Sequence, residues 1–306
     1  MTTKYTLKNL PNDELAAPGR SGCDGCGAVM IARWITKISG QSTMMVNATG
    51  CMCVNYGYAG VPRFPYIHSL FENTGSIISG IDAGLRSLGK RDTTNLIGLA
   101  GDGGTVDIGL QALSGAVDRN HRFLYVCYDN EGYMNTGGQR SGATPYGSKT
   151  ATTPVGSEKV GETLSLARRK NMVLIMAAHG IPYAATASIA YPLDFMNKVK
   201  KAIEIDGPTY IHVLAPCPTS WGFPSENSVN LGRLAVETRF SPIFEVEQGK
   251  KIILDRRKSK GTPVLEYLKV QKRFLHLLDP KNQFIVDQIQ FQVDEGWNYL
   301  DSLAQE

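Results

Sequence analysis

Two cysteines three positions apart, Cys23 and Cys26, lie in the glycine-rich stretch RSGCDGCG. Thiols at this spacing are typical of half a zinc site, of thiol–disulfide exchange or of half an iron–sulfur site. Two further cysteines follow strand-like runs: Cys51 ends STMMVNATGC, and Cys217 ends TYIHVLAPC. Four thiols gathered at one sheet edge could hold Zn²⁺ or a [4Fe–4S] cluster, and spacing alone slightly favours zinc.

The remaining cysteines are weaker candidates. Cys53 competes with Cys51 for the third ligand position in TGCMC. Cys127 lies inside the apolar run FLYVCYDN, where a small packed hydrophobic side chain is expected. Six cysteines in a chain of 306 residues are expected to be ligands or buried thiols, because a chain of this length needs no disulfide framework.

Oxygen side chains follow two other strand-like runs. Asp102 comes directly after TNLIGLAG, and Asp129 and Asn130 end FLYVCYDN. Ligands of open parallel sheets bind at the carboxyl ends of strands, and oxygen ligands suit Mg²⁺ bound to phosphates. Gly103 and Gly104, before a predicted helix, allow backbone N–H groups to approach a phosphate. The pattern therefore predicts a diphosphate–Mg²⁺ site in outline.

The elements that must position these residues alternate between strand and helix. Helical periodicity covers 28–38, 73–89, 107–119 and 192–205, and apolar runs between them predict strands. Continuous apolar strands are typical of a parallel sheet covered on both faces. The sequence predicts an α/β fold with a doubly wound, mostly parallel sheet, helices on both faces and a C-terminal tail.

Three segments are expected along the chain. Residues 1–22 read as an extended N-terminal arm, and 23–225 as the cofactor-binding domain. Residues 226–306 read as a C-terminal helical tail, with helices over 266–278 and 284–304. We expect this tail to make a subunit contact, with a solvated surface helix as the alternative.

Composition excludes several function classes. Hydrophobic residues make up 42% and charged residues 20%, with a net charge of +4 and no basic run of the kind that binds nucleic acid. The apolar run MVLIMAA is far shorter than the ~20 residues needed to cross a bilayer. The N-terminus lacks the apolar core of a signal peptide, so we expect a cytoplasmic protein with no membrane partner.

The spacing of the oxygen site matches a known motif. Gly101-Asp102-Gly103 is followed by 26 residues and then Asn130, which resembles the thiamine diphosphate motif, although a lone Gly-Asp-Gly is usually only a turn. The run GDGGTVDIGLQALSGAVDRNHRFLYVCYDNEGYMNTGGQRSGATPYG resembles the β subunit of the 2-oxoacid:ferredoxin oxidoreductases, of which pyruvate:ferredoxin oxidoreductase is the best known. The likeness extends over TGCMC, PYIHSLFENTGSIISGIDAGL and APCPTSWGFP, and covers most of 20–225.

The resemblance implies a role for each candidate residue. It implies that Asp102, Asn130 and the Gly132 carbonyl bind Mg²⁺, and that Cys51, beside the cofactor, and Asn135 take part in catalysis. A [4Fe–4S] cluster rather than zinc is implied for the four cysteines, because the reaction needs an electron exit, and Cys53 is left as a buried thiol. The residues expected to hold cofactors are Cys23, Cys26, Cys51, Cys217, Gly101, Asp102, Gly103, Gly104, Asn130, Gly132, Tyr133 and Asn135.

The resemblance also implies the reaction and the partners. A 2-oxoacid, with pyruvate the default, would react with coenzyme A to give an acyl-CoA, CO₂ and reduced ferredoxin. The family places the activating Glu on another subunit, and no ferredoxin-like C-x₂-C-x₂-C run is present, so α, γ and ferredoxin-like δ subunits are expected. Alternatives are a branched-chain, aromatic or oxalate-type 2-oxoacid, a non-redox thiamine diphosphate enzyme with structural zinc, and a non-catalytic phosphate-binding module.

Overall fold

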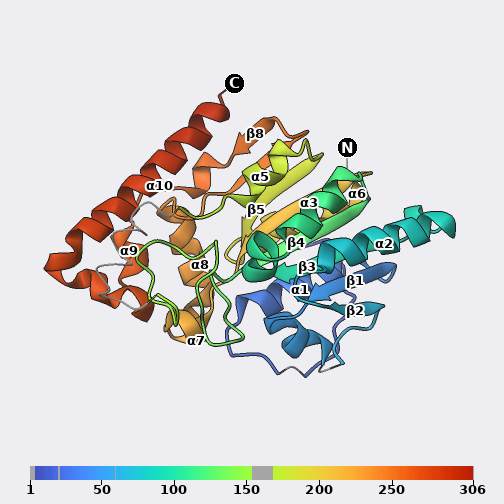
Figure 1. Cartoon of the computed structure of the whole chain (residues 1–306), viewed down its shortest axis with the longest axis horizontal. Coiled ribbons are helices and arrows are strands. Elements are labelled where there is room, and N and C mark those ends of the chain that lie inside the picture. The colour runs from blue at the N-terminus through green and yellow to red at the C-terminus, as the bar shows by residue number, and fades with distance from the viewer. Residues whose placement is uncertain (1–3, 20, 59, 154–167, 306) are drawn as a thin grey trace.

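A single eight-stranded sheet organises the chain in the computed structural model, which describes residues 4–19, 21–58, 60–153 and 168–305 (Figure 1). The strand order is β2-β1-β3-β4-β6-β5-β7-β8, with every pair parallel from β2 to β5 and the last two pairs antiparallel. The predicted mostly parallel α/β sheet is confirmed. The strands are β1 (Thr43–Ala48), β2 (Tyr66–Ser69), β3 (Asn95–Gly101), β4 (Phe123–Asp129), β5 (Tyr183–Ser188), β6 (Pro208–Leu214), β7 (Phe244–Glu247) and β8 (Lys251–Leu254).

Helices cover both faces of this sheet. One hydrophobic core joins α1 and α6 to one face, and a second core joins α2, α3 and α5 to the other. Alternate residues of a strand enter opposite cores, as Leu124 and Tyr125 of β4 do. The helices are α1 (Gly27–Ser39), α2 (Thr74–Ser87), α3 (Leu110–Asp118), α5 (Met172–Ala178), α6 (Pro192–Glu204), α7 (Pro218–Trp221), α8 (Ser228–Glu237), α9 (Leu265–Leu268) and α10 (Gln283–Leu303).

Small residues set how closely α2 packs. A β-carbon on Gly75 would lie 2.6 Å from the Ala112 backbone of α3, and one on Gly98 of β3 would lie 2.4 Å from Ile78 Cδ1. Only glycine allows these approaches, so α2 lies tightly against both α3 and the sheet. The packing explains the small-residue composition of this helix.

The strand register brings the candidate residues to one edge. Gly101 at the end of β3 is opposite Tyr128 of β4, and Asp129 is opposite Leu214 of β6. The chain therefore leaves β3, β4 and β6 at the same level, and the Ala215 N–H donates to the Asp129 carbonyl across a 2.8 Å bond. This carboxyl edge is where the sequence predicted ligand binding.

The C-terminal region differs from the expected helical tail. Two of its segments, β7 and β8, extend the sheet in antiparallel fashion beside β5. The helix expected over 266–278 is interrupted: Gln271 is extended, and the Lys272 N–H donates to the Gly222 carbonyl at 3.1 Å. A tertiary bond thus replaces the next helical turn, and a 3₁₀ segment follows. The long helix α10, red in Figure 1, packs Trp297 and Leu300 into the second core.

None of the helices in the described part of the chain is both long enough and apolar enough to span a bilayer.

Candidate functional site

A cavity of about 270 Å³ opens at the carboxyl edge of the sheet. It brings together the loops that follow β1, β3 and β4, as the register requires. Seven predicted residues line it, and Thr49, Phe71 and Tyr128 were missed by the sequence reasoning. The lining residues are Thr49, Gly50, Cys51, Phe71, Gly101, Gly103, Tyr128, Asn130, Gly132, Tyr133, Met134, Asn135 and Thr136.

Asp102 lies directly beneath this cavity and is fully buried. The Ser141 hydroxyl donates a short hydrogen bond to its Oδ2 atom. Burial, followed by the nearby charge of Asp129, raises the pKa of the Asp102 carboxyl well above its usual range. A buried carboxyl with so few hydrogen bonds is a group that a cation would stabilise in its charged form.

Asn130 faces Asp102 with its amide group. The amide atom on that side is 2.9 Å from both Asp102 Oδ1 and the Gly132 carbonyl oxygen. If the amide nitrogen of Asn130 faces Asp102, it donates to the Asp102 and Gly132 oxygens. If the amide oxygen faces Asp102 instead, it meets these two oxygens with no hydrogen atom between them. Adjacent ligands of an octahedral Mg²⁺, each ~2.0–2.1 Å from the ion, lie about 3 Å apart. The distances from the Asn130 amide to Asp102 and to Gly132 therefore fit adjacent Mg²⁺ ligands.

Asp129 turns away from this group, although the sequence offered it as an oxygen ligand beside Asn130. Its Oδ2 atom accepts from His212 Nε2 at 2.8 Å and from Arg169 Nη2 at 3.1 Å, and its Oδ1 atom accepts from the Glu131 N–H. Burial raises its pKa, but the bond from His212 and the charge of Arg169 more than offset that, so the net pKa is lowered. Asp129 therefore anchors the loop.

The glycines after β3 have the close contacts expected of a phosphate-binding turn. A β-carbon on Gly103 would lie 2.5 Å from the Tyr133 ring, and one on Gly104 would lie 3.1 Å from the Phe71 carbonyl oxygen. The backbone N–H groups at this turn are therefore not shielded by side chains of their own. Tyr133 is fixed in turn, because its hydroxyl donates to Asp107 at 3.0 Å.

Asn135 is exposed at the mouth of the cavity on a tight turn. Tyr133 pairs with Gln139 across this turn, and Gly137 and Gly138 have φ values of 114° and 80°. Only glycine adopts these values readily, so the NTGG sequence closes the turn and presents Asn135 to the cavity.

The four predicted cysteine ligands approach one another at the same edge. Burial raises the pKa of Cys51 to about 12, and charges on Cys26, Cys217 and Cys23 add to this shift. Cys26 precedes α1 and Cys217 precedes α7, while Cys23 is exposed. Among the described residues, no group of three or more His, Cys, Asp or Glu side chains is arranged to hold a metal ion. Thiol donors close to one another suit a soft metal or an iron–sulfur cluster, but these four thiols are not arranged as a metal-binding group.

The secondary candidates behave as packing residues. The Cys53 thiol is buried and bonds to the backbone N–H and carbonyl of Gly50, and Cys127 is fully buried in β4. His68 of β2 bonds through Nε2 to the Thr49 hydroxyl at 2.8 Å, which is a structural contact.

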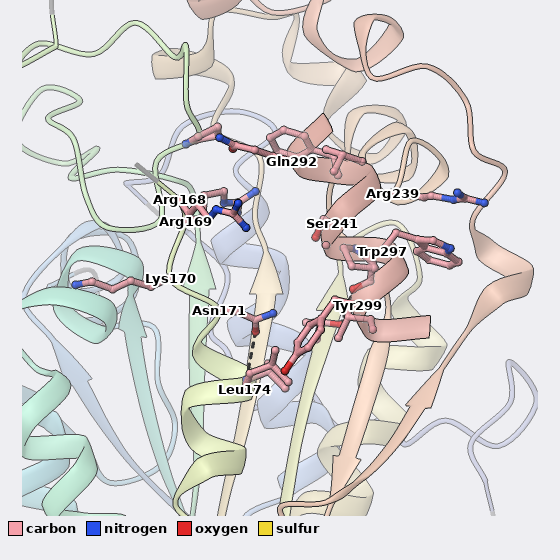
Figure 2. Close-up of a pocket in the computed structure, with 18 of the residues that line it drawn as sticks. Arg168, Arg169, Lys170, Asn171, Leu174, Arg239, Ser241, Gln292, Trp297 and Tyr299 are labelled. Atoms are coloured by element: carbon pink, nitrogen blue, oxygen red, sulfur yellow. Dashed lines mark hydrogen bonds between the residues drawn. The ribbon is translucent and has the colours of Figure 1, made fainter. Parts of the chain in front are cut away.

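A second cavity, of about 340 Å³, lies on the other side of the loop after β4 (Figure 2). Arg169 reaches into it from the segment before α5, opposite Trp297 and Tyr299 of α10. Arg169 also contacts Asp129 and Glu131, so this cavity borders the outer side of the loop that carries Asn130. The sequence offered no signal for it.

Comparison with known proteins gives the family. Residues 38–213 match the family described as thiamine pyrophosphate enzyme, C-terminal TPP binding domain. The chain is 48% identical over 302 residues to pyruvate synthase subunit PorB of Methanocaldococcus jannaschii, covering 96% of this chain and 99% of the relative. It is 43% identical over 308 residues to ketoisovalerate oxidoreductase subunit VorB of Pyrococcus horikoshii, with 97% and 95% covered. This chain belongs to the β subunits of the 2-oxoacid:ferredoxin oxidoreductases.

The fold of this β subunit has a solved counterpart. The 2-oxoglutarate:ferredoxin oxidoreductase from Magnetococcus marinus aligns with a TM-score of 0.58 and 23% identity, covering 70% of each chain. The predicted thiamine-diphosphate-binding fold is thereby confirmed, and the β subunit is a component of an oxidoreductase with a thiamine diphosphate domain.

Proposed function

We propose that this β subunit catalyses the oxidative decarboxylation of pyruvate within a complex of α, β, γ and ferredoxin-like δ subunits. The overall reaction converts a 2-oxoacid, coenzyme A and two oxidised ferredoxins into an acyl-CoA, CO₂, a proton and two reduced ferredoxins. One observation carries the proposal: a single cavity joins Cys51 to the Asn130–Asn135 loop in a chain related end to end to pyruvate synthase subunits.

The proposed metal site uses the Asp102 and Asn130 side chains and the Gly132 carbonyl, which would hold Mg²⁺. Gly101, Gly103 and Gly104 would bind the diphosphate of thiamine diphosphate, and Tyr133 and Asn135 would line its reactive end. Bound thiamine diphosphate would supply the electron sink for breaking the bond between the carboxyl and keto carbons. This chain supplies orientation and charge, through Asp102 and the oxygens at 2.9 Å.

The proposed electron exit is a [4Fe–4S] cluster held by Cys23, Cys26, Cys51 and Cys217. Support comes from Cys51, which lines the cavity, and from the three other thiols whose charges act on it. The assignment is tested by measuring the iron, sulfide and zinc contents of the complex purified without oxygen. About four iron atoms and four sulfides per β subunit are expected, whereas stoichiometric zinc without iron would contradict it.

Substrate choice is tested by a panel of 2-oxoacids with coenzyme A and a redox dye. We expect the highest kcat/KM with pyruvate. We also propose that the protein is cytoplasmic and that ferredoxin is its physiological electron acceptor. A branched-chain 2-oxoacid is the second candidate, because VorB relatives share 43% identity over nearly the full length. A higher kcat/KM with ketoisovalerate would favour that candidate, and no dye reduction with any 2-oxoacid would contradict the function.

A further inference from the structure

Glu131 sits between two proposed Mg²⁺ ligands, Asn130 and Gly132, and has two unusual properties. Its side chain is fully buried, with a relative exposure of 0%. Its backbone has a φ of 64°, a left-handed conformation that is uncommon for residues with a side chain. A buried carboxylate is costly unless it is paired, so something must hold Glu131 in this position.

The partner is Arg273, which follows Glu131 by 142 positions in the chain. Arg273 Nη2 is 2.5 Å from Glu131 Oε2, and Arg273 itself is only 4% exposed. Its Nε atom donates to Gln271 Oε1 at 2.9 Å, which fixes the plane of the guanidinium. Arg169 contributes the second charge, 2.9 Å from Glu131 Oε1, from the side of the second cavity.

Trp221 connects the same arginine to the metal loop a second time. Its indole N–H donates to the Asn130 carbonyl at 2.8 Å, and its ring lies 3.8 Å from the Arg273 guanidinium carbon. The ring and the charge stack, as cation–π pairs do. Two consecutive loop residues, Asn130 and Glu131, are thus held from one direction by one stacked pair.

Arg273 and Trp221 both lie beyond residue 213, where the match to the TPP binding domain ends. We propose that Arg273 and Trp221 are positioning residues that hold residues 130–132 so that the Asn130 amide and the Gly132 carbonyl face Asp102. The inference rests on the proposed Mg²⁺ site and extends it, because it makes the C-terminal region part of the cofactor site.

General stabilisation is the competing explanation. A buried ion pair that only supports the fold would lower the stability when broken, with no selective effect on metal or cofactor. A positioning pair would change the affinity of the folded protein for Mg²⁺ and thiamine diphosphate. Residues that orient metal ligands from outside typically change metal affinity by ~10–100-fold when mutated.

The test uses the full chain in its purified complex, stripped of cofactor. Arg273→Met and Arg273→Lys are compared with Arg257→Met, whose exposed arginine has a side-chain exposure of 93%. Thiamine diphosphate binding is titrated at several Mg²⁺ concentrations, and thermal unfolding of the cofactor-free protein is followed by circular dichroism. We expect Arg273→Met to raise the Mg²⁺ concentration needed for half-maximal binding about 10-fold or more, Arg273→Lys to recover part of it, and Arg257→Met to change nothing.

Three outcomes decide the matter. Unchanged Mg²⁺ dependence in folded Arg273→Met would overturn the inference, even with a lower unfolding temperature. If Arg273→Met fails to fold, Trp221→Phe tests the same proposal, because it keeps an aromatic ring beside Arg273 and removes the indole N–H donated to Asn130. Unaltered Mg²⁺ dependence in that variant would also overturn it. Wild-type complex that binds thiamine diphosphate without any need for Mg²⁺ would instead contradict the proposed function and the inference together.

Discussion

The proposed oxygen ligands and the proposed thiol ligands lie at the same sheet edge but differ in how completely they are formed. Asp102 Oδ1 and the Gly132 carbonyl oxygen each lie 2.9 Å from the same amide atom of Asn130. The charges of the other three cysteines add to the raised pKa of Cys51, yet the described residues hold no formed thiol metal site. The oxygen atoms are therefore at the separation of adjacent Mg²⁺ ligands, whereas the thiols form no metal-binding group among the described residues.

The difference follows from what holds each group. The oxygen ligands directly follow β3 and β4, in a loop bonded through Asp129, Ser141 and Trp221. Cys23 and Cys26 lie in an irregular segment before α1, where the Cys26 N–H donates to the Cys23 carbonyl at 3.2 Å. Thiols also make weak hydrogen bonds, which direct a side chain poorly. We therefore expect a cluster to impose the final geometry of the thiols when it binds.

The strongest test of the oxygen group is Asp102→Ala. Removing the fully buried carboxylate leaves Asn130 and Gly132 with no anionic ligand, so Mg²⁺-dependent thiamine diphosphate binding should fall below detection. Iron content should stay at the wild-type level, because the thiols are held separately. Titration with thiamine diphosphate and iron analysis measure both, with the exposed Asp118→Ala as a matched carboxylate control. Normal cofactor occupancy in Asp102→Ala would contradict the assigned site.

The mirror-image test is Cys217→Ala against Cys53→Ala. The first should abolish the cluster and leave Mg²⁺-dependent thiamine diphosphate binding within about 3-fold. The second should keep both, because the Cys53 thiol bonds to the Gly50 backbone. Iron and sulfide are measured on both variants purified without oxygen. Cluster loss in Cys53→Ala alone would show that the third ligand was assigned to the wrong cysteine.

The same comparison explains how far the sequence alone reached. Asp102, Asn130 and Cys217 could be predicted because each follows a recognisable apolar run, and parallel strands place such positions at one edge. Ser141 and Arg273 could not, because they meet Asp102 and Glu131 across 39 and 142 residues with no local pattern to mark them. The four-residue strands β7 and β8 were read as part of a helical tail, since so short a run carries little periodicity.

A smaller effect is expected from Ser141→Ala, which probes how well the oxygen group is prepared. The variant removes the hydrogen bond that the Ser141 hydroxyl donates to Asp102 Oδ2 and leaves the carboxylate in place. Loss of a single hydrogen bond to a charged group costs ~1.5–3 kcal/mol, so thiamine diphosphate affinity at fixed Mg²⁺ should fall by about 10-fold to 150-fold. Ser114→Ala, on the exposed face of α3, is the matched control. Equal affinity in wild type and Ser141→Ala would mean that Mg²⁺ alone orients Asp102.

The smallest effect concerns the wild-type protein after its iron is removed. If the cluster imposes the thiol geometry, its removal should speed amide hydrogen exchange in residues 21–26, where few backbone bonds restrain the chain. Residues 126–132 should exchange at an unchanged rate, because Trp221, Arg273 and the strand register hold them without the cluster. Exchange measured by mass spectrometry before and after iron removal, with Mg²⁺ and thiamine diphosphate held constant, compares the two. Equal acceleration in both segments would mean that the two groups form one cooperative unit, and the contrast between a prepared and an unprepared site would not stand.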